Sequence, residues 1–337
     1  MTKAELIEQL RIAIRRKHYS YATEKTYVTW TAQFFEFSQT RADMPAEQRA
    51  GLFLDDLAPR VSGKTQHQAL CALAFLFKEV LGRKDADFGK WRPAQRPRTL
   101  PEVLSQSEVR AVLSQMTGVQ RLMAELCYGA GLRLMDCCRL RIKDVHFDRG
   151  VIVIRDGKGD KDRITCLPKS VREPLAEHIQ RVRTLYEADR RANRPGIYLP
   201  DALSRKFPRA GEEWPWFWLF PSKSESTDPH TGTVRRHHVH ETSLQKCMKA
   251  AVAAAKIPRR ITVHTLRHSF ATHLLESGVD INKVKELLGH AHIETTAIYL
   301  HCVQTFASGV TSPLDLPASN VVAFPTTAPQ PRIAAAI

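Results

Sequence analysis

Six side chains in the last two thirds of the sequence are of types that could together break a phosphodiester bond. Guanidinium groups bind the non-bridging oxygens of a phosphate in a fixed fork geometry and neutralise transition-state charge. A tyrosine hydroxyl can form a covalent ester, a lysine can protonate the leaving 5′ oxygen, and histidines can move protons near neutral pH. The residues are Arg133, Lys158, His264, Arg267, His290 and Tyr299. They supply every role of a strand cleavage that needs no metal ion.

Each of these residues also has an ordinary structural explanation. Arg133 and Asp136 could form an exposed ion pair on a helix. Lys158 could simply lie in a polar hairpin turn, and a His-x-x-Arg sequence on a helix is a weak signal. Tyr299 could be a half-buried core residue. Order and spacing favour the chemical interpretation, because the intervals between the six residues are 25, 106, 3, 23 and 9.

The charge of the chain points to a polyanionic partner. The 337 residues include 50 Lys and Arg against 35 Asp and Glu, a formal net charge of +15. Residues 1–90 carry only +3 of this excess, so most of it lies in the later part. A positive field attracts phosphate backbones, whose counterions are released on binding. Charge alone does not separate a DNA enzyme from an RNA-binding protein.

The sequence gives no sign of export or membrane insertion. No run approaches the roughly 18 consecutive apolar residues of a membrane span, and the N-terminus lacks a secretory apolar core. The seven cysteines form no Cys-x-x-Cys pair, which favours reduced thiols over disulfides or a zinc site. We therefore expect a cytoplasmic protein, associated with the nucleoid if its partner is DNA.

Two domains and a tail are predicted from the patterning. Residues 1–90 show helical spacing in 3–16, 23–37 and 47–57 and again after Ser62, a candidate N-cap, and predict a small helical domain. Residues 91–101 are basic and broken by prolines, which is typical of a linker. A second domain is predicted over 102–312, and 313–337, rich in Pro, Ala and Thr, are expected to be a disordered tail.

The second domain contains clear local signals. Ser105 with Glu108 has the form of a capping box at the start of a helix. Residues 151–154 predict a β-strand, 156–160 a turn that carries Lys158, and 164–167 the returning strand.

In residue types, order and spacing, the chain resembles the tyrosine recombinase (phage integrase) family over nearly its whole length. The resemblance implies a mainly α fold with a small antiparallel sheet (α+β). A helical core-binding (SAM-like) domain would precede the catalytic domain of a DNA breaking-rejoining enzyme. It implies a nucleophilic Tyr299, a 3′-phosphotyrosine intermediate, no cofactor, and a homotetramer on two synapsed DNA sites. The other five residues named first would be catalytic, and Asp136 would support Arg133, although the family more often has Glu there.

The long interval before His264 resembles the extra segment of integron integrases, here placed at about 195–238. The resemblance implies recognition of a folded single-stranded cassette hairpin besides a duplex integration site. Protruding bases stack well on aromatic groups. Alternatives for the segment are a buried strand at 214–220 and zinc binding by neighbouring histidines. The DNA contacts implied are Trp216, Pro229, Arg236, His237 and His238.

These inferences converge on a metal- and ATP-independent site-specific recombinase that inserts and excises gene cassettes. Three alternatives stay open. A chromosome-dimer resolvase or phage-type integrase would share the chemistry but should lack the segment 195–238. A type IB topoisomerase-like enzyme would use the same intermediate without exchanging partners. A DNA-binding accessory protein would keep the fold without catalysis.

Overall fold

The computed structural model describes residues 2–94, 100–155, 162–228 and 231–302. Lys158, Pro229 and the predicted tail therefore lie outside the described residues. The chain divides into two compact units, 1–99 and 100–337, each described here by itself. Within the described ranges, no helix combines the length and apolarity needed to cross a membrane.

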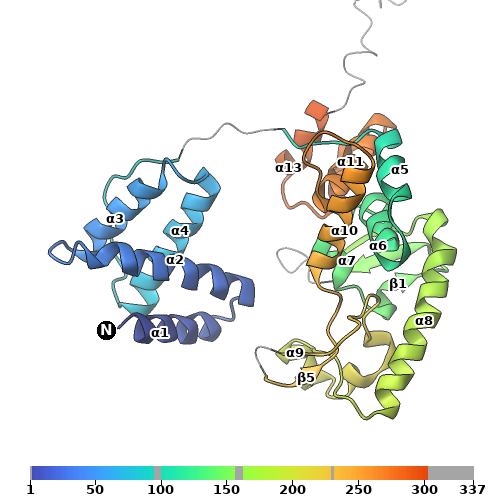
Figure 1. The fold of residues 1–337 in the computed structure, drawn as a ribbon, viewed down its shortest axis with the longest axis horizontal. Coiled ribbons are helices and arrows are strands. Elements are labelled where there is room, and N and C mark those ends of the chain that lie inside the picture. The colour runs from blue at the N-terminus through green and yellow to red at the C-terminus, as the bar shows by residue number, and fades with distance from the viewer. Residues whose placement is uncertain (1, 95–99, 156–161, 229–230, 303–337) are drawn as a thin grey trace, which may run out of the picture. The chain divides into compact units, whose positions relative to one another are not determined.

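Helices make up the first unit, as predicted (Figure 1). Thr2 begins the first helix with a capping box to Glu5, and Ser20 and Ser62 cap the second and fourth through their hydroxyls. The predicted cap at Ser62 is thus confirmed. The helices are α1 (Lys3–Arg16), α2 (Tyr21–Gln39), α3 (Ala46–Leu57) and α4 (Gly63–Phe75), which continues into a π-helical turn, η1 (Leu76–Val80).

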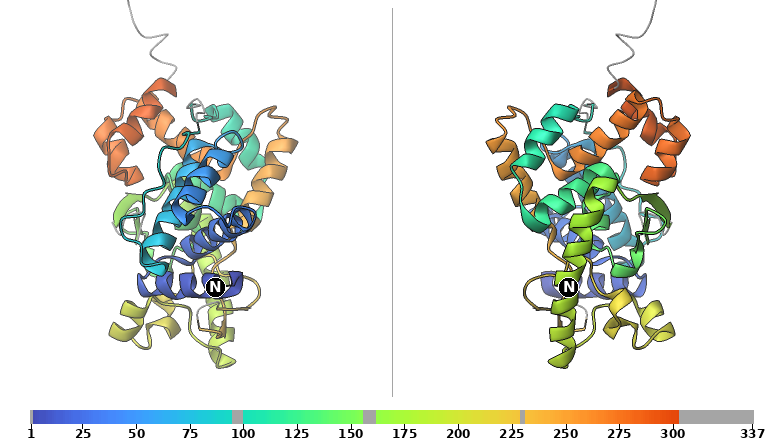
Figure 2. Two further views of the ribbon diagram at one scale, coloured as in Figure 1. Left: turned by 90° about the vertical axis from the view of Figure 1, so that its left-hand side faces the viewer. Right: turned by 90° about the vertical axis from the view of Figure 1, so that its right-hand side faces the viewer.

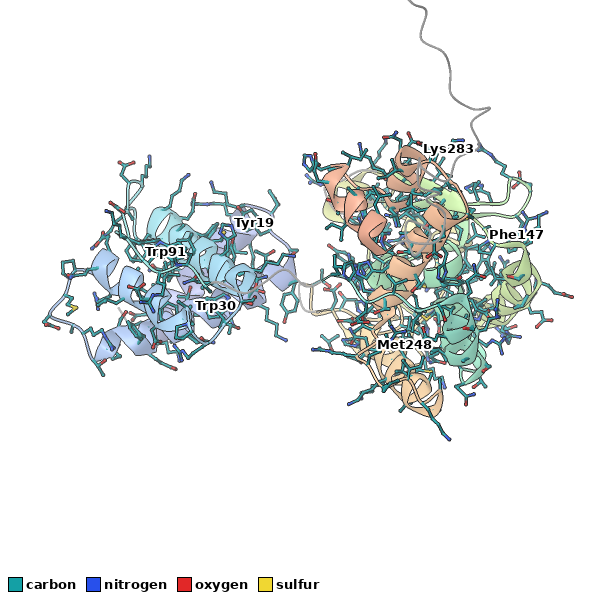
Figure 3. The ribbon with its side chains drawn as sticks, turned by 90° about the horizontal axis from the view of Figure 1, so that it is seen from above. Tyr19, Trp30, Trp91, Phe147, Met248 and Lys283 are labelled. Atoms are coloured by element: carbon teal, nitrogen blue, oxygen red, sulfur yellow. The ribbon has the colours of Figure 1, made fainter. Side chains whose placement is uncertain are left out.

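The core of this unit is aliphatic and aromatic. Leu10, Leu54 and Leu73 are fully buried, and the ring of Phe34 lies 5.8 Å from that of Phe53. Trp30, labelled in Figure 3, is 9% exposed in the same cluster. Burial of such side chains removes apolar surface from water and stabilises the helical packing.

The second unit is mixed, with helices around a small sheet. The predicted capping box at Ser105 is confirmed, and the first helix of the unit starts there. A long helix, α8, runs along one side of this unit (Figures 1 and 2). The helices outside the segment 195–238 are α5 (Gln106–Ser114), α6 (Gly118–Gly129), α7 (Leu134–Cys138), α8 (Arg172–Arg191), α10 (Glu241–Ala254), α11 (Val263–Glu276), α12 (Ile281–Leu288) and α13 (Glu294–Ala297).

The sheet has the predicted hairpin as its centre. Strand β2 (Val151–Ile154) pairs antiparallel with β3 (Arg163–Cys166) and with β1 (Val145–His146), in the order β1-β2-β3. Ile154 faces Arg163 in the register of the hairpin. The turn that carries Lys158 lies outside the described residues.

The segment 195–238 has short elements and its own small core. They are α9 (Asp201–Lys206), the 3₁₀ turns η4 (Ala210–Glu212) and η5 (Trp214–Trp216), and the pair β4 (Ser226–Thr227) and β5 (Val234–Arg235). Phe217 and Trp218 are buried against Ile197 and Leu199. The alternative of a buried strand at 214–220 is confirmed only in part. Trp214–Trp216 form a 3₁₀ turn, whereas Phe217, Trp218 and Phe220 are buried and Trp218 forms an isolated β-bridge with Arg141.

Candidate active site

Helix α11 carries three of the polar residues that meet in the second unit. It begins at the capping box of Thr262 with Thr265. His264 is exposed, His268 is half-buried, and Arg267 is only 1% exposed. Since residues four apart share a helix face, His264 and His268 lie against each other, with ring centroids 4.4 Å apart.

The C-terminal end of α12 holds three arginines by its backbone. Nε of Arg163 donates to the carbonyl of Leu287 (3.2 Å), and Nη2 of Arg267 donates to that of Leu288 (2.6 Å). Nη2 of Arg133 donates to the carbonyl of Gly289 (3.3 Å). The last carbonyls of a helix have no partners within it and carry the negative end of the helix dipole. This end therefore satisfies its own carbonyls by orienting the guanidinium groups.

Two glycines permit this close packing. Gly289 has φ +62°, and a Cβ there would lie 2.6 Å from Cδ of Arg163. Gly131 has φ +63°, and its Cβ would lie 2.5 Å from the ring of Phe270. The carbonyl of Gly131 also accepts a hydrogen bond from Nη1 of Arg267. A side chain at either position would be strained; at Gly289 it would push against Arg163, and at Gly131 against Phe270 and Leu288.

Asp136 joins two of the arginines. Its Oδ2 lies 2.6 Å from Nη2 of Arg163 and 3.6 Å from Nη1 of Arg133. The same carboxylate accepts from the backbone N–H of Arg133, at the start of α7. Asp136 thus contacts both the side chain and the backbone of Arg133, which is the supporting position predicted for it.

The arginine cluster is electrostatically prepared for an anion. Burial lowers the pKa of Arg267 to about 9, and the neighbouring Arg133 and Arg163 add to the decrease. Burial likewise lowers the pKa of Arg163, although Asp136 opposes this. Like charges held together by carbonyls gain stability when a negative group neutralises them. A phosphate beside Arg133 and Arg267 would do so.

His290 connects this cluster to Tyr299. Its Nδ1 is 2.8 Å from Oγ1 of Thr296, and its Nε2 is 3.2 Å from Nη2 of Arg267. Its ring stacks on that of Tyr299, with centroids 6.3 Å apart and planes at 22°. Burial, followed by the charges of Arg267 and Arg133, lowers the pKa of His290 to about 4. His290 is therefore a neutral hydrogen-bonding group at pH 7.

Tyr299 lies in the 3₁₀ turn η6 (Ile298–Cys302) and is 4% exposed. Its ring packs against a small apolar cluster that includes Phe270 and Leu288. Its hydroxyl is 2.9 Å from Nδ1 of His268. The burial of this tyrosine matches the structural alternative raised for it. Its hydroxyl nevertheless ends in a polar environment beside the arginine cluster.

The structure thus brings together most of the predicted catalytic set. Arg133, Arg267, His290 and Tyr299 are linked by the contacts above, and His264 joins them through His268. A hollow of about 750 Å³ opens at this place, and its lining includes Arg133, Arg163, Gly289 and His290. Lys158 falls between β2 and β3 in the sequence and lies outside the described residues.

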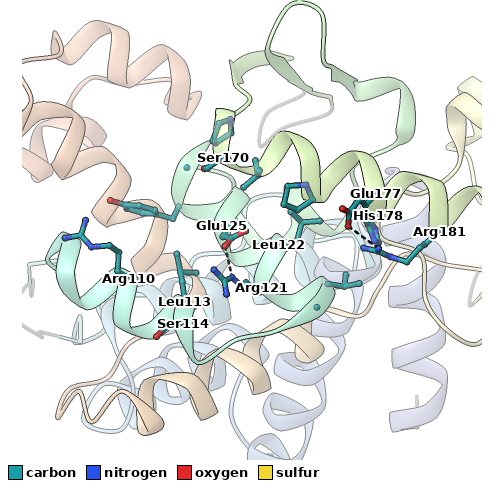
Figure 4. A pocket seen from close by; sticks show the side chains of 17 residues that line it. Arg110, Leu113, Ser114, Arg121, Leu122, Glu125, Ser170, Glu177, His178 and Arg181 are labelled. Carbon is teal, nitrogen blue, oxygen red and sulfur yellow. Dashed lines mark hydrogen bonds and ion pairs between the residues drawn. The ribbon is translucent and has the colours of Figure 1, made fainter.

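A larger hollow, of about 850 Å³, contains none of these residues. It lies between α5, α6 and α8, and Figure 4 shows the side chains that line it. Two of its arginines already face carboxylates: Arg121 is 2.8 Å from Glu125 and Arg181 is 3.7 Å from Glu177. Of the candidate catalytic residues, Arg133 and His290 line the smaller hollow instead.

Two functional side chains were missed by sequence reasoning. Arg163 directly precedes the apolar strand predicted over 164–167, and nothing local marks it as buried. His268 follows Arg267 in the sequence and stands four residues after His264. Its helical spacing was a usable signal, because it places both histidines on the face of α11 that was expected to carry chemistry.

A third hollow, of about 280 Å³, lies between the segment 195–238 and residues 135–155, and aromatic and basic groups line it together with Asp136 and Asp144. Nζ of Lys143 is 2.8 Å from the ring centroid of Trp216, and the guanidinium of Arg141 is 4.4 Å from that of Trp218. His238 packs edge-on against Trp218, and burial lowers the pKa of both His237 and His238. All six of these side chains line the hollow.

Arg236 requires a correction, because it was predicted to contact DNA. It is 5% exposed, and its Nε and Nη2 both donate to the carboxylate of Asp189 at 2.6 and 2.8 Å. Its Nη1 donates to the carbonyls of Ser222 and Lys223. A guanidinium engaged in this way ties the segment to α8 and does not reach a DNA backbone. Pro229, another predicted contact, lies outside the described residues.

Comparison with known proteins defines the class to which this fold and site belong. Residues 102–305 match the model of the phage integrase family, and residues 6–87 match that of the phage integrase N-terminal SAM-like domain. The chain belongs to the phage integrase family: it is a tyrosine recombinase, an enzyme that cleaves and rejoins DNA.

Individual relatives are recombinases as well. An integrase/recombinase of Escherichia coli is 44% identical over 321 residues, which cover 94% of each chain. The tyrosine recombinase XerA of Pyrococcus horikoshii is 30% identical over 304 residues, 89% of this chain and 90% of that protein.

Solved structures agree on the fold. XerH recombinase bound to palindromic difH matches with a TM-score of 0.60 at 21% identity, covering 91% of this chain and 83% of that one. A lambda integrase dimer bound to a COC′ core site matches with a TM-score of 0.57 at 14% identity, covering 89% and 95%.

Proposed function

We propose that this recombinase is an integron-type integrase that joins gene cassettes to an integration site. The hollow with Trp216, Trp218, His237 and His238 carries the proposal. In the structure Lys143 lies over the ring of Trp216. An unpaired nucleotide would displace Lys143 from that ring face, stack its base there and meet the displaced cation with its phosphate. A fully paired duplex hides its base faces, so such a hollow serves a folded single strand.

The chemistry is assigned to the cluster at α11 and α12. The hydroxyl oxygen of Tyr299 attacks the scissile phosphorus, which forms a 3′-phosphotyrosine and releases a 5′ hydroxyl. Arg133 and Arg267 hold the non-bridging oxygens. Lys158 protonates the departing 5′ oxygen, and His264 and His290 hydrogen-bond the phosphate or move protons. A 5′ hydroxyl of the partner strand then reverses the reaction, so bond energy is conserved and ATP is not needed.

The nucleophile is tested by replacing Tyr299 with Phe. One oxygen is removed while the packing against Phe270 and Leu288 stays, so DNA binding should be nearly unchanged. Covalent protein–DNA adducts, detected on denaturing gels, should disappear. Adducts that persist in the Phe variant would overturn the assignment of Tyr299.

The subfamily is tested by binding to three DNAs: a cassette hairpin, the same hairpin without its protruding bases, and a duplex integration site. Trp216→Ala and His238→Ala should weaken binding to the intact hairpin by about ten- to a hundredfold, the usual value of one stacked base. Binding to the duplex depends on phosphate contacts spread over the protein and should change little.

Trp214→Ala is the matched control. Trp214 stacks on Phe217, with centroids 6.4 Å apart, but does not line the hollow. It should bind all three DNAs as the wild type does, and its fold is checked by circular dichroism. If the Trp216 and His238 variants also bind the hairpin like the wild type, the integron assignment fails.

A Xer-type or phage-type integrase is the second candidate, favoured by the 30% identity to XerA over 89% of the chain. That outcome would be indicated by equal binding of wild-type protein to the intact and the base-deleted hairpin. In either case we propose that the protein works as a homotetramer on two synapsed sites, on chromosomal DNA in the cytoplasm. Sedimentation of the protein–DNA complex tests the tetramer.

A further inference from the structure

His268 lies where the proton of the nucleophile must go. Its Nδ1 is 2.9 Å from the hydroxyl oxygen of Tyr299, within the range of a good hydrogen bond. The centroids of the two rings are 5.4 Å apart. The contact joins a residue of α11 to the turn that carries the tyrosine. His268 has no role in the mechanism described above.

We propose that His268 is a catalytic residue that accepts the phenolic proton of Tyr299 when the tyrosine oxygen attacks phosphorus. The proposal rests on the proposed role of Tyr299 as nucleophile. As the O–H bond breaks, its electron pair forms the new O–P bond and its proton moves to Nδ1 of His268. The bond from phosphorus to the 5′ oxygen breaks, and that oxygen takes its proton from Lys158. When the 5′ hydroxyl of the partner strand attacks, its proton goes to Lys158, and the tyrosine oxygen leaves and takes the proton back from His268.

The other histidine beside the tyrosine is already engaged. His290 stacks on the ring of Tyr299, but its Nδ1 meets Thr296 and its Nε2 meets Arg267. A ring with both nitrogens in hydrogen bonds must break one of them before it can take a further proton. Nδ1 of His268 needs no such rearrangement, because its hydrogen bond is to the reacting hydroxyl itself.

Electrostatics keeps His268 neutral, and it makes the ring a weak base until an anion binds beside it. Burial, and then the neighbouring His264 and Arg267, lower the pKa of His268 to about 4, so the ring is neutral at pH 7. With its hydrogen on Nε2, the ring offers the lone pair of Nδ1 to the tyrosine. A phosphate bound at Arg133 and Arg267 cancels positive charge there. It therefore makes protonation of His268 easier when substrate is present.

His264 gives the proton a route outward. It is exposed, one helical turn before His268, and the two rings meet edge to face at 4.4 Å. The Nε2 side of His268 can pass a proton to this neighbour or to solvent. The pair therefore divides the work: His268 contacts the tyrosine, and His264 contacts solvent.

The test uses His268→Asn, whose amide can replace the hydrogen bond of Nδ1 but cannot accept a proton. Cleavage of a suicide duplex at pH 7 should slow by at least about a hundredfold, the usual contribution of a general base. Binding to the same duplex should be unchanged. His273→Asn is the matched control on the same helix, where the histidine contacts Tyr128 instead. It should cleave at close to the wild-type rate.

A more acidic phenol separates proton transfer from simple packing. Difluorotyrosine placed at position 299 of His268→Asn should restore much of the lost rate, because this more acidic phenol gives its proton to water and does not need a basic side chain. The same replacement in the wild type should change the rate little. A 5′-phosphorothiolate substrate, which needs no proton on its leaving group, should rescue Lys158→Ala but not His268→Asn.

The outcomes are distinguishable from failure of the proposed function. Covalent adducts formed by Tyr299→Phe would show that Tyr299 is not the nucleophile, and the proposed role of His268 would then fail as well. If Tyr299→Phe is inactive but His268→Asn cleaves at the wild-type rate, only the role of His268 is overturned. Equal effects of difluorotyrosine on wild type and variant would overturn it as well. Should the Asn variant unfold by circular dichroism, His268→Gln is measured in the same way.

Discussion

At the scale of single residues, the site combines buried positive charge with neutral histidines. Arg267 is 1% exposed, and its pKa falls to about 9 because of its burial and its arginine neighbours. These same arginines help to hold the pKa of His290 near 4, and Arg267 contributes to that of His268. Without substrate, the cluster therefore disfavours protonation of the two histidines.

This arrangement predicts acid sensitivity. His268 and His290 bind protons less readily in the folded than in the unfolded chain, where the ordinary pKa of histidine is about 6.5. Folding stability from these groups is therefore complete above pH 6.5 and is lost as the pH falls towards 4. The loss is about 3 kcal/mol per histidine at most. Urea unfolding of the wild type between pH 7 and 4.5 should show it. The double variant His268→Asn, His290→Asn should show a flatter dependence, and an equal slope in both proteins would contradict the explanation.

Lys158 gives a second prediction at this scale, from its sequence position between two glycines. Lys158→Ala should slow cleavage by about a hundredfold or more while DNA binding weakens only slightly. A 5′-phosphorothiolate substrate should restore the rate, because sulfur leaves without a proton. Equal defects on both substrates would make Lys158 a backbone contact only. The comparison needs single-turnover rates and a binding curve for each substrate.

At the scale of elements, the end of α12 decides the geometry of the site. Gly289 adopts a left-handed conformation, and its missing Cβ leaves space for Arg163. Gly289→Ala should cost about 1–2 kcal/mol from the backbone alone, and the displaced Arg163 should pull on Asp136. We expect the single-turnover cleavage rate to fall by more than the loss of folded protein accounts for, when both are measured for the same variant. Gly278→Ala is the control, since that glycine also has positive φ (+83°) but has open space around its Cβ position.

Elements were the part of the molecule that the sequence predicted best. The cap at Ser105 and the strand at Val151–Ile154 depend on neighbouring residues, so local patterns reveal them. The returning strand shows the limit. Ile164 is 53% exposed and Arg163 is 8% exposed, the reverse of what hydrophobicity suggests. Partners of Arg163 come from Asp136 and Leu287, which only the tertiary fold brings close.

The same distinction holds within the site. Spacing identified Arg133, Arg267, His290 and Tyr299, because their residue types and order are those of a known reaction. It did not identify His268, whose hydroxyl partner stands 31 residues later in the chain. For Arg236 the sequence suggested a functional role that the structure does not support. It was expected to contact DNA, and it is instead paired with Asp189 on α8. The sequence around a basic residue near aromatics does not show whether the fold will pair that residue with a buried carboxylate.

At the scale of the whole molecule, the net charge of +15 governs the encounter with DNA. Duplex binding should fall steeply with salt, because each neutralised phosphate releases counterions. For six to ten phosphate contacts the loss is about 10³ to 10⁵ between 50 and 200 mM salt. In the wild type, the preference for the intact hairpin over the hairpin without protruding bases should persist across this salt range, since stacking is less sensitive to ions. Trp216→Ala should lack this preference at every salt concentration. Filter-binding titrations at several salt concentrations measure both quantities.

The three carbonyls at the end of α12 have one more consequence, which concerns time. They belong to the consecutive residues Leu287, Leu288 and Gly289 and hold Arg163, Arg267 and Arg133 in turn. An opening of that last helical turn breaks all three contacts in one event. Arg267 would then keep its contact with the carbonyl of Gly131, and Arg163 and Arg133 would keep theirs with Asp136, but none of the three would hold the place that α12 gives it. At any moment, the fraction of molecules able to cut DNA cannot exceed the fraction in which this one turn is closed.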